Sequence, residues 1–454
     1  MRLTRSTRTA SGICGLLVAA GTATGCAGAG TLAQGGGDSA IVVAIIANPQ
    51  MEDAISLAPE FFEEQAGIDV SFITLPENEA RAKITASVAT GGGEFDVVMI
   101  SNYETPQWAE NGWLTNLQPY ADKTRGYDPQ DFFPSIRQAL SYDGDLYSVP
   151  FYGESSFLVY RDDLFRQAGL KMPAQPTWPQ VAELARKLDD PARGVSGICL
   201  RGLAGWGENL APLNTVVNTF GGRWFDMDWD AQLTEKPFVD AVEFYVDLVQ
   251  SYGEPGAATS GFSECVTLYA QGQAAMWYDA TSMVSTIESE ADSTVVGKNA
   301  YAPAPVVETD VSGWLYSWSL GIPETSDSKD EAWEFVSWMT DKDYIRLVGE
   351  ELGWARVPPG SRLSTYQIPQ YAKQAKAYAE PTLTALKTVD PNKPTVDPVP
   401  YSGIQFVGIP EFQDLGTRVS QQVSAAIAGQ QTVEEALDQS QGYAEVVGDS
   451  YQED

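Results

Sequence analysis

Short apolar runs alternate with segments of helical pattern through the N-terminal part of the chain. The runs Ala40–Ala47, Ile68–Leu75 and Phe95–Ile100 are apolar or β-branched along most of their length, as strands buried on both faces are. Between them, Met51–Gln65 spaces its apolar side chains as one face of a helix does, and Glu77–Ala89 is predicted as a second helix. This order of elements predicts a parallel sheet with helices on both faces.

Polar residues follow these predicted strands where each strand ends. Ligands of a parallel α/β sheet bind beyond the carboxyl ends of its strands. Asn48 follows the first strand, Glu77 follows the second, and Ser101, Asn102 and Tyr103 follow the third. We therefore expect these residues to share one rim of the sheet.

Strand and helix patterns continue along the chain without an evident internal repeat. Tyr147–Val159 is a strand that passes through Pro150, as a segment crossing between domains would, and Ala274–Tyr278 and Trp314–Ile322 are further strands. Pro237–Leu248 is an amphipathic helix with proline at its start. A chain of 454 residues exceeds the size at which one hydrophobic core keeps growing. Two or more domains are therefore expected.

One stretch, Ile198–Asp226, combines a cysteine, two tryptophans, several glycines, amides and carboxylates. Glycines beside flat indoles and fixed hydrogen-bonding groups suit a shallow ligand rich in hydroxyl groups. The alternative is a surface loop at Gly202–Gly207 that leads into an ordinary helix with a buried tryptophan.

Composition narrows the classes of function. The formal net charge of −33 disfavours nucleic-acid binding, which needs clustered lysine and arginine. The 12 tryptophans and 20 tyrosines are compatible with stacking against sugars, although most of these rings belong in a core. No histidine occurs, which excludes Ser-His-Asp and Cys-His catalysis and the usual zinc ligand. We expect neither a metal site nor a cofactor.

The N-terminus reads as an export signal. Arginines at positions 2, 5 and 8 precede a short apolar segment, Ile13–Ala20, and small residues then lead to Cys26. This pattern resembles a bacterial lipobox, with Ala23 where leucine is usual, and predicts residues 1–25 as a lipoprotein signal peptide and Cys26 as the lipidated residue. Residues 26–39 are predicted as a flexible tether. The alternative is a plain secretory signal, and either reading predicts an exported protein.

Cysteine usage follows from export. Cys14 is lost with the signal and Cys26 carries lipid, which leaves Cys199 and Cys265. Two thiols in an oxidising compartment pair more often than they stay free. We predict a disulfide between Cys199 and Cys265.

The order of several motifs resembles the extracellular solute-binding proteins of carbohydrate ABC importers, in the maltose-binding-protein-like branch. The features are the lipobox, the predicted N-terminal strand–helix–strand–helix–strand order, GQAAMWYDATS (Gly272–Ser282), GWLYSWSLGIP (Gly313–Pro323), EAWEFVSWMT (Glu331–Thr340) and AAIAGQQTVEEAL (Ala425–Leu437). Within that branch, four segments resemble the sorbitol/mannitol-binding subgroup: Arg201–Asn209, Gly221–Asp226, Ala274–Ser282 and Trp354–Gly360.

The resemblance implies a two-lobed α/β periplasmic-binding-protein fold of class II type. Each lobe is then a mainly parallel sheet flanked by helices, with the ligand cleft between the lobes. The chain would cross near Val149–Phe151, Tyr278–Thr281 and Leu347–Leu352. The expected N-terminal lobe is 40–149 plus 281–348, and the C-terminal lobe is 150–280 plus 349–450.

A polyol or sugar site needs charge-assisted hydrogen bonds to hydroxyl groups and indoles over C–H faces. The expected contacts are the acceptors Glu77, Glu154, Glu208 and Asp279, the amides Asn102 and Asn209, the donor Arg356, the indoles Trp206, Trp224, Trp314 and Trp318, and Tyr103 and Tyr152 beside them. Several have structural alternatives: a core position for Trp224 and Trp318, a cap for Asp279, a helix dipole contact for Glu77 and an ion pair for Arg356. Trp206 and Glu208 stand out, since Gly205 and Gly207 leave little else for that loop to pack.

The expected function is capture of a sorbitol- or mannitol-type alditol by hinge closure and delivery to an ABC permease, without catalysis. The protein would act as a monomer anchored through Cys26 on the outer face of the cytoplasmic membrane. The alternatives are a monosaccharide or oligosaccharide ligand, an exported glycoside hydrolase with two of Glu154, Glu208 and Asp279 as its carboxylate pair, and a lipid-anchored adhesion or scaffold protein. Organic anions are disfavoured by the net charge and by the scarcity of arginine and lysine near the candidates.

Overall fold

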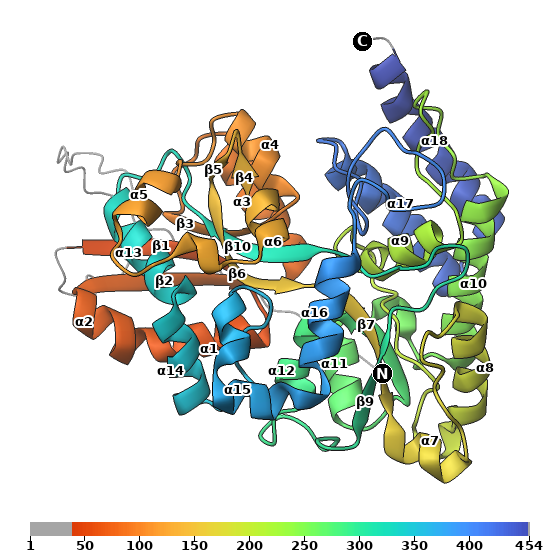
Figure 1. Ribbon diagram of the computed structural model, residues 1–454. Coiled ribbons are helices and arrows are strands. Elements are labelled where there is room, and N and C mark those ends of the chain that lie inside the picture. The colour runs from red at the N-terminus through yellow and green to blue at the C-terminus, as the bar shows by residue number, and fades with distance from the viewer. Residues whose placement is uncertain (1–38, 453–454) are drawn as a thin grey trace, which may run out of the picture. The chain divides into compact units, whose positions relative to one another are not determined.

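Two main sheets organise residues 39–452, the part of the chain that the computed structural model describes (Figure 1). The predicted signal peptide, Cys26 and all but the last residue of the predicted tether lie outside these residues. None of the helices within 39–452 combines the length and apolar character that a membrane span requires.

The first sheet has the strand order β2-β1-β3-β10-β6. Its strands are β1 (Ser39–Ile46), β2 (Ile68–Leu75), β3 (Val97–Ser101), β6 (Ser148–Glu154) and β10 (Tyr316–Gly321). β1 pairs in parallel with β2 and β3, as the apolar runs predict, whereas β10 is antiparallel to both β3 and β6. The helices of this lobe are α1 (Pro49–Ala58), α2 (Glu64–Ala66), α3 (Glu77–Ala89), α4 (Glu104–Glu110), α5 (Gln118–Lys123), α6 (Pro134–Ala139), α13 (Lys329–Thr340), α14 (Lys342–Glu351) and α15 (Pro369–Gln374), with the small hairpin β4 (Ser141–Tyr142) and β5 (Asp145–Leu146).

Local capping fixes the first turn at the rim of this sheet. Asn48 comes directly after β1, and its side-chain oxygen accepts a hydrogen bond from the Met51 amide at 3.0 Å. Pro49 occupies the first helical position, where its missing N–H costs nothing. α1 therefore starts immediately at the carboxyl end of β1, and Asn48 lies on the predicted rim.

The second sheet has the order β8-β7-β9, and its strands are β7 (Ser156–Arg161), β8 (Met276–Ala280) and β9 (Asn299–Pro303). All pairs between these strands are antiparallel, so the expectation of a mainly parallel second sheet is wrong for them. The helices of this lobe are α7 (Asp162–Ala168), α8 (Trp178–Leu188), α9 (Leu210–Thr219), α10 (Lys236–Tyr252), α11 (Phe262–Ala270), α12 (Val284–Ile287), α16 (Ala379–Thr388), α17 (Phe412–Ile427) and α18 (Val433–Gln452).

The antiparallel pairs have a topological cause. β7 enters the second sheet from β6 and runs away from the junction between the lobes, whereas its neighbour β8 runs back toward the junction. The same holds for β10, which enters the first sheet and lies against β3 with Trp318 opposite Ser101. A strand that enters a lobe directly from the other lobe is therefore antiparallel to its neighbours in the sheet. Two α/β lobes with helices around each sheet agree with the expected fold class (Figure 1).

The lobe boundaries differ from the expected ones. The first crossing lies between β6 and β7, at 154–156. β9 pairs with β7, so the second crossing follows Pro303 rather than Tyr278–Thr281, and 299–303 belongs to the second sheet. The turn Leu363–Gln367 packs on α14, whereas α16 packs on β7 and β9, so the third crossing lies between α15 and α16 rather than near Leu347–Leu352. The sequence shows apolar strand patterns but not which sheet each strand joins.

The predicted disulfide between Cys199 and Cys265 is present, and both residues are fully buried. It joins the segment that precedes the loop 201–209 to helix α11. The loop therefore departs from a covalently fixed point in the second lobe.

Candidate functional site

A cavity of about 280 Å³ lies between the two lobes, at the rim of the first sheet. Its first-lobe residues are Ile46, Ala47, Asn48, Pro76, Glu77, Arg81, Tyr152, Glu154, Tyr316 and Trp318. Its other residues, which come from the second lobe and the segments beside it, are Arg201, Leu203, Gly207, Glu208, Phe262, Ser263, Glu264, Ala280, Ser282 and Gln405. The lining combines carboxyl, guanidinium and hydroxyl groups with aromatic rings, which suits a small hydroxylated ligand.

Arg201 brings a guanidinium to the second-lobe side of the cavity. Asp279, fully buried at the end of β8, accepts hydrogen bonds from Arg201 Nε at 2.8 Å and Nη2 at 2.5 Å. Arg201 Nη1 donates to the carbonyl of Gly207 at 2.8 Å. Burial alone would lower the pKa of Arg201, but the carboxyl groups of Asp279, Glu208 and Glu77 together raise that pKa. Asp279 thus holds a charged arginine in place and does not itself line the cavity.

Arg81 is fixed on the first-lobe side by contacts on its edge and on its faces. Its Nε donates to Glu77 at 3.0 Å and its Nη1 to Glu104 at 2.8 Å, while Nη2 donates to the Tyr316 hydroxyl at 2.5 Å. Its guanidinium carbon lies 4.1 Å from the ring centroid of Trp206 and 4.4 Å from that of Trp318. Such sandwiching of a guanidinium between indoles is a favourable cation–π arrangement.

Burial raises the pKa of two cavity carboxyls, those of Glu154 and Glu208. Burial raises the pKa of Glu154 to about 8, although a hydrogen bond from Ser282 at 2.6 Å works in the opposite direction. Burial and then repulsion from Glu77 raise the pKa of Glu208 to about 8. A protonated carboxyl both donates and accepts hydrogen bonds, as a hydroxyl group does. In either protonation state these carboxyls accept hydrogen bonds from the hydroxyls of a neutral ligand.

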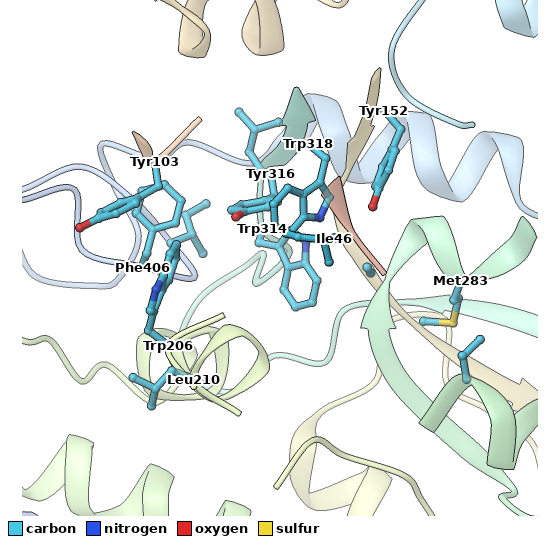
Figure 2. Packing of buried hydrophobic residues seen from close by; sticks show 14 of the residues in the cluster. Ile46, Tyr103, Tyr152, Trp206, Leu210, Met283, Trp314, Tyr316, Trp318 and Phe406 are labelled. Atoms are coloured by element: carbon cyan, nitrogen blue, oxygen red, sulfur yellow. The ribbon is translucent and has the colours of Figure 1, made fainter. Parts of the chain in front are cut away.

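The lobes approach closely where the loop 201–209 meets helix α3. Asn78 Nδ2 donates to the carbonyl of Ala204 at 2.9 Å. A Cβ at Gly207 would lie 2.2 Å from Oε1 of Glu77, so a larger residue there would displace the Glu77 carboxylate. Trp206 completes the contact with ring centroids 4.8 Å from Tyr103 of the first lobe (Figure 2).

The structure brings five of the expected ligand contacts to the cavity: Glu77, Tyr152, Glu154, Glu208 and Trp318. Trp206 does not line it, because its ring is occupied by Arg81 and Tyr103.

The remaining expected contacts lie elsewhere. Arg356 pairs with Asp53 through Nε at 2.9 Å and with Asp292, the ion pair that was its alternative. Asn102 accepts a hydrogen bond from the Ser317 amide at 2.9 Å, and Asn209 donates to the Ser420 carbonyl at 3.0 Å. Trp314 is buried beside Tyr278, and Trp224 donates to Asn214 at 3.0 Å in the second-lobe core.

Several lining residues were missed by the sequence reasoning, above all Arg81, Arg201, Tyr316 and Gln405. The stated scarcity of arginine near the site is therefore wrong. Arg81 lies four residues after Glu77 on a predicted helix, a spacing that puts both on one face, and this signal could have found it. Nothing comparable points to Gln405, which reaches the cavity from a long irregular segment.

Comparison with known proteins supplies independent information. Residues 48–345 match the family described as bacterial extracellular solute-binding protein. The chain is 44% identical over 407 residues to a mannitol-binding protein of Pseudomonas aeruginosa, covering 89% of this chain and 92% of that protein. The crystal structure of an ABC transporter solute-binding protein from Agrobacterium vitis S4 with bound D-mannitol matches with a TM-score of 0.89 and 44% identity, covering 91% of this chain and 99% of the other. A ribitol complex from Agrobacterium radiobacter K84 matches in fold at a TM-score of 0.79 and 24% identity, covering 90% and 99% of the two chains.

Proposed function

Because this chain belongs to the bacterial extracellular solute-binding protein family, we propose that it captures a neutral linear polyol of the mannitol type for an ABC importer. The two relatives that share 44% of their residues with it are a mannitol-binding protein and a structure holding D-mannitol. The observation that carries the proposal is the cavity itself, whose guanidinium groups are compensated by neighbouring carboxyls. A neutral ligand with many hydroxyls suits such a lining.

Each side of the cavity has a part in holding the ligand. On the first lobe, Glu77, Glu154 and Tyr152 offer hydrogen bonds, and Trp318 offers an apolar surface to C–H groups. On the second lobe, Arg201 and Glu208 offer hydrogen bonds from the opposite wall. A ligand that contacts both walls stabilises the closed arrangement of the lobes through contacts that the open arrangement lacks. The closed form is then recognised by the permease, and no bond of the ligand is broken.

Export and anchoring complete the proposal. The family is extracellular, and the lipobox-like end of the signal segment supports lipidation at Cys26 and attachment to the outer face of the cytoplasmic membrane. We expect the protein to act there as a monomer.

Calorimetry against a panel of mannitol, sorbitol, glucose, maltose and mannitol 1-phosphate tests the ligand class. The expected result is one-to-one binding that is tightest for an alditol, with the phosphate ester rejected because the guanidinium groups of Arg81 and Arg201 are already paired with carboxylates. Binding of glucose or maltose in preference to every alditol would contradict the proposal. Solution scattering should show a smaller radius of gyration with saturating alditol, and an unchanged profile would count against closure.

A glycoside hydrolase would also use carboxyls such as Glu154 and Glu208. Incubation with aryl glycosides and maltose separates the two functions, since a binding protein releases no product. Product release that is abolished in Glu154→Gln would favour the hydrolase.

A further inference from the structure

A second hollow lies beside the ligand cavity, still between the two lobes. It has a volume of about 200 Å³, and Tyr103, Leu315, Ile404 and Phe406 contribute to its lining. We refer to it as the outer hollow. None of these four residues lines the ligand cavity.

Neighbouring residues on two segments face the two spaces alternately. Tyr316 and Gln405 line the ligand cavity, whereas the residues next to them in the chain, Leu315 and Phe406, line the outer hollow. The ring centroid of Phe406 lies 5.2 Å from that of Tyr103 and 6.2 Å from that of Tyr316. Figure 2 shows the rings of Tyr103 and Phe406 together beside Tyr316. These rings form a partition between the two spaces.

The segment that carries Phe406 is held to the second lobe. Asn214 and Asn218, four residues apart on α9, donate hydrogen bonds to the carbonyls of Gln405 at 2.8 Å and Ile404 at 2.9 Å. The segment also folds on itself, since the Gly408 amide donates to the Ser402 carbonyl at 2.7 Å. The backbone of Ile404 and Gln405 is thus fixed by one helix. This fixed backbone directs Gln405 toward the ligand cavity and Phe406 toward the outer hollow.

Gln405 lines the ligand cavity, and its side-chain amide makes no hydrogen bond within residues 39–452. Only 6% of the residue is exposed, and its side-chain oxygen accepts no hydrogen bond from any residue in 39–452. A buried acceptor without a partner is unfavourable, so rotation of the Gln405 amide toward a ligand hydroxyl would gain a hydrogen bond that the protein does not otherwise make.

We propose that Gln405 and Phe406 together set the length of the ligand: Gln405 accepts a hydrogen bond from a hydroxyl of the polyol, and Phe406 closes the cleft behind it. The inference rests on the proposed polyol function and extends it to the exclusion of ligands that carry a further sugar ring. Phe406 belongs to the second lobe and contacts first-lobe rings, so the partition is complete only when the lobes are closed.

Replacing Phe406 by alanine tests the partition, with maltitol, an alditol that carries one glucosyl ring, as the probe. We expect Phe406→Ala to bind maltitol at least tenfold more tightly than the unaltered protein does, because the glucosyl ring gains the outer hollow. Leu315→Ala is the matched control, since it enlarges the same hollow without opening the partition and should give no such gain. If Phe406→Ala gives no cooperative melting transition, Phe406→Val carries the same test. A folded variant that gains no more maltitol affinity than Leu315→Ala overturns the length limit.

Replacing Gln405 by leucine tests the acceptor. We expect mannitol affinity to fall about tenfold, the loss of one hydrogen bond, with an unchanged or higher melting temperature because the unpaired oxygen is gone. A purely structural glutamine would instead lower the melting temperature and leave the affinity unchanged, which overturns this part. Mannitol binding by the unaltered protein tests the proposed function separately. A negative result with either variant therefore contradicts the length limit or the acceptor role without contradicting the polyol function.

Discussion

Glu154 shows how a single cavity residue couples stability to pH. Its ordinary pKa of 4.5 is raised to about 8 by burial. Between these values the unfolded chain binds fewer protons than the folded protein, so the free energy of unfolding falls as the pH rises and levels off above pH 8. Glu154→Gln removes this titration. The variant should gain stability relative to the unaltered protein between about pH 5 and pH 8, by at most about 1.4 kcal/mol per pH unit. Denaturant unfolding without ligand measures this, and a constant difference across the range would contradict the assignment.

Asp279 and Arg201 give a second prediction at the residue scale. Asp279→Asn leaves Arg201 buried beside a neutral amide, so the free energy of unfolding should fall by roughly 3 kcal/mol. Mannitol affinity should fall as well, because Arg201 is no longer held against the cavity wall. Glu183→Gln is the control, since Glu183 pairs with Arg186 on an exposed helix face and such pairs contribute about 0–1 kcal/mol. Equal effects of the two substitutions in denaturant unfolding would argue against a special role for the buried pair.

Some cavity residues can be predicted from the sequence, whereas contacts between residues of different lobes cannot. Glu77 and Glu208 could be predicted because each lies where a predicted strand or glycine-rich loop meets the rim. Trp206 lies in the predicted loop, but its ring is covered by Arg81, a contact between residues 125 positions apart (206 − 81). Pairings across the lobes depend on how the lobes meet, which the spacing of residues along one segment does not contain.

Helix α11 and the disulfide act together at the scale of elements. Cys265 on α11 is bonded to Cys199, and the amide of Phe262 at the start of the same helix donates to Glu208 at 3.2 Å. Removing the bond in a Cys199→Ala, Cys265→Ala double variant should lower the free energy of unfolding by roughly 4 kcal/mol, given a separation of 66 residues. Weaker mannitol binding should accompany it, because the anchor of the loop 201–209 is lost. Melting curves measure the stability of the double variant, and calorimetry measures its affinity for mannitol. The unaltered protein under mild reductant is the control. Unchanged stability in the variant would contradict the prediction.

The strands of the first sheet could be predicted because they are continuous apolar runs. β9 (Asn299–Pro303) could not, because only Ala302 of its five residues is buried and the strand carries no apolar pattern. The second crossing between the lobes follows that strand, so the expected crossing near Tyr278–Thr281 lies too early in the chain. Short edge strands are specified by their neighbours in space more than by their own residues.

Contacts between the lobes govern the behaviour of the whole molecule. Trp206 of the second lobe lies against Arg81 and Tyr103 of the first, and these contacts exist only when the lobes meet. Trp206→Phe should therefore raise the dissociation rate of mannitol about tenfold with little change in the association rate, since cation–π contacts contribute roughly 0.5–2 kcal/mol. Stopped-flow fluorescence measures both rates. Trp178→Phe, at a buried position within the second lobe alone, is the control and should leave both rates unchanged. A slower association rate with unchanged dissociation would contradict this role.

The chain passes between the lobes three times, at 154–156, after β9, and between α15 and α16. An odd number of passages leaves the first described strand, β1, and the last described helix, α18, on different bodies. Attaching a fluorescent donor to one end of this region and an acceptor to the other therefore converts closure into a change in energy transfer. The topology makes the molecule a ready scaffold for an optical sensor, and the partition at Phe406 would set which sugar alcohols such a sensor reports.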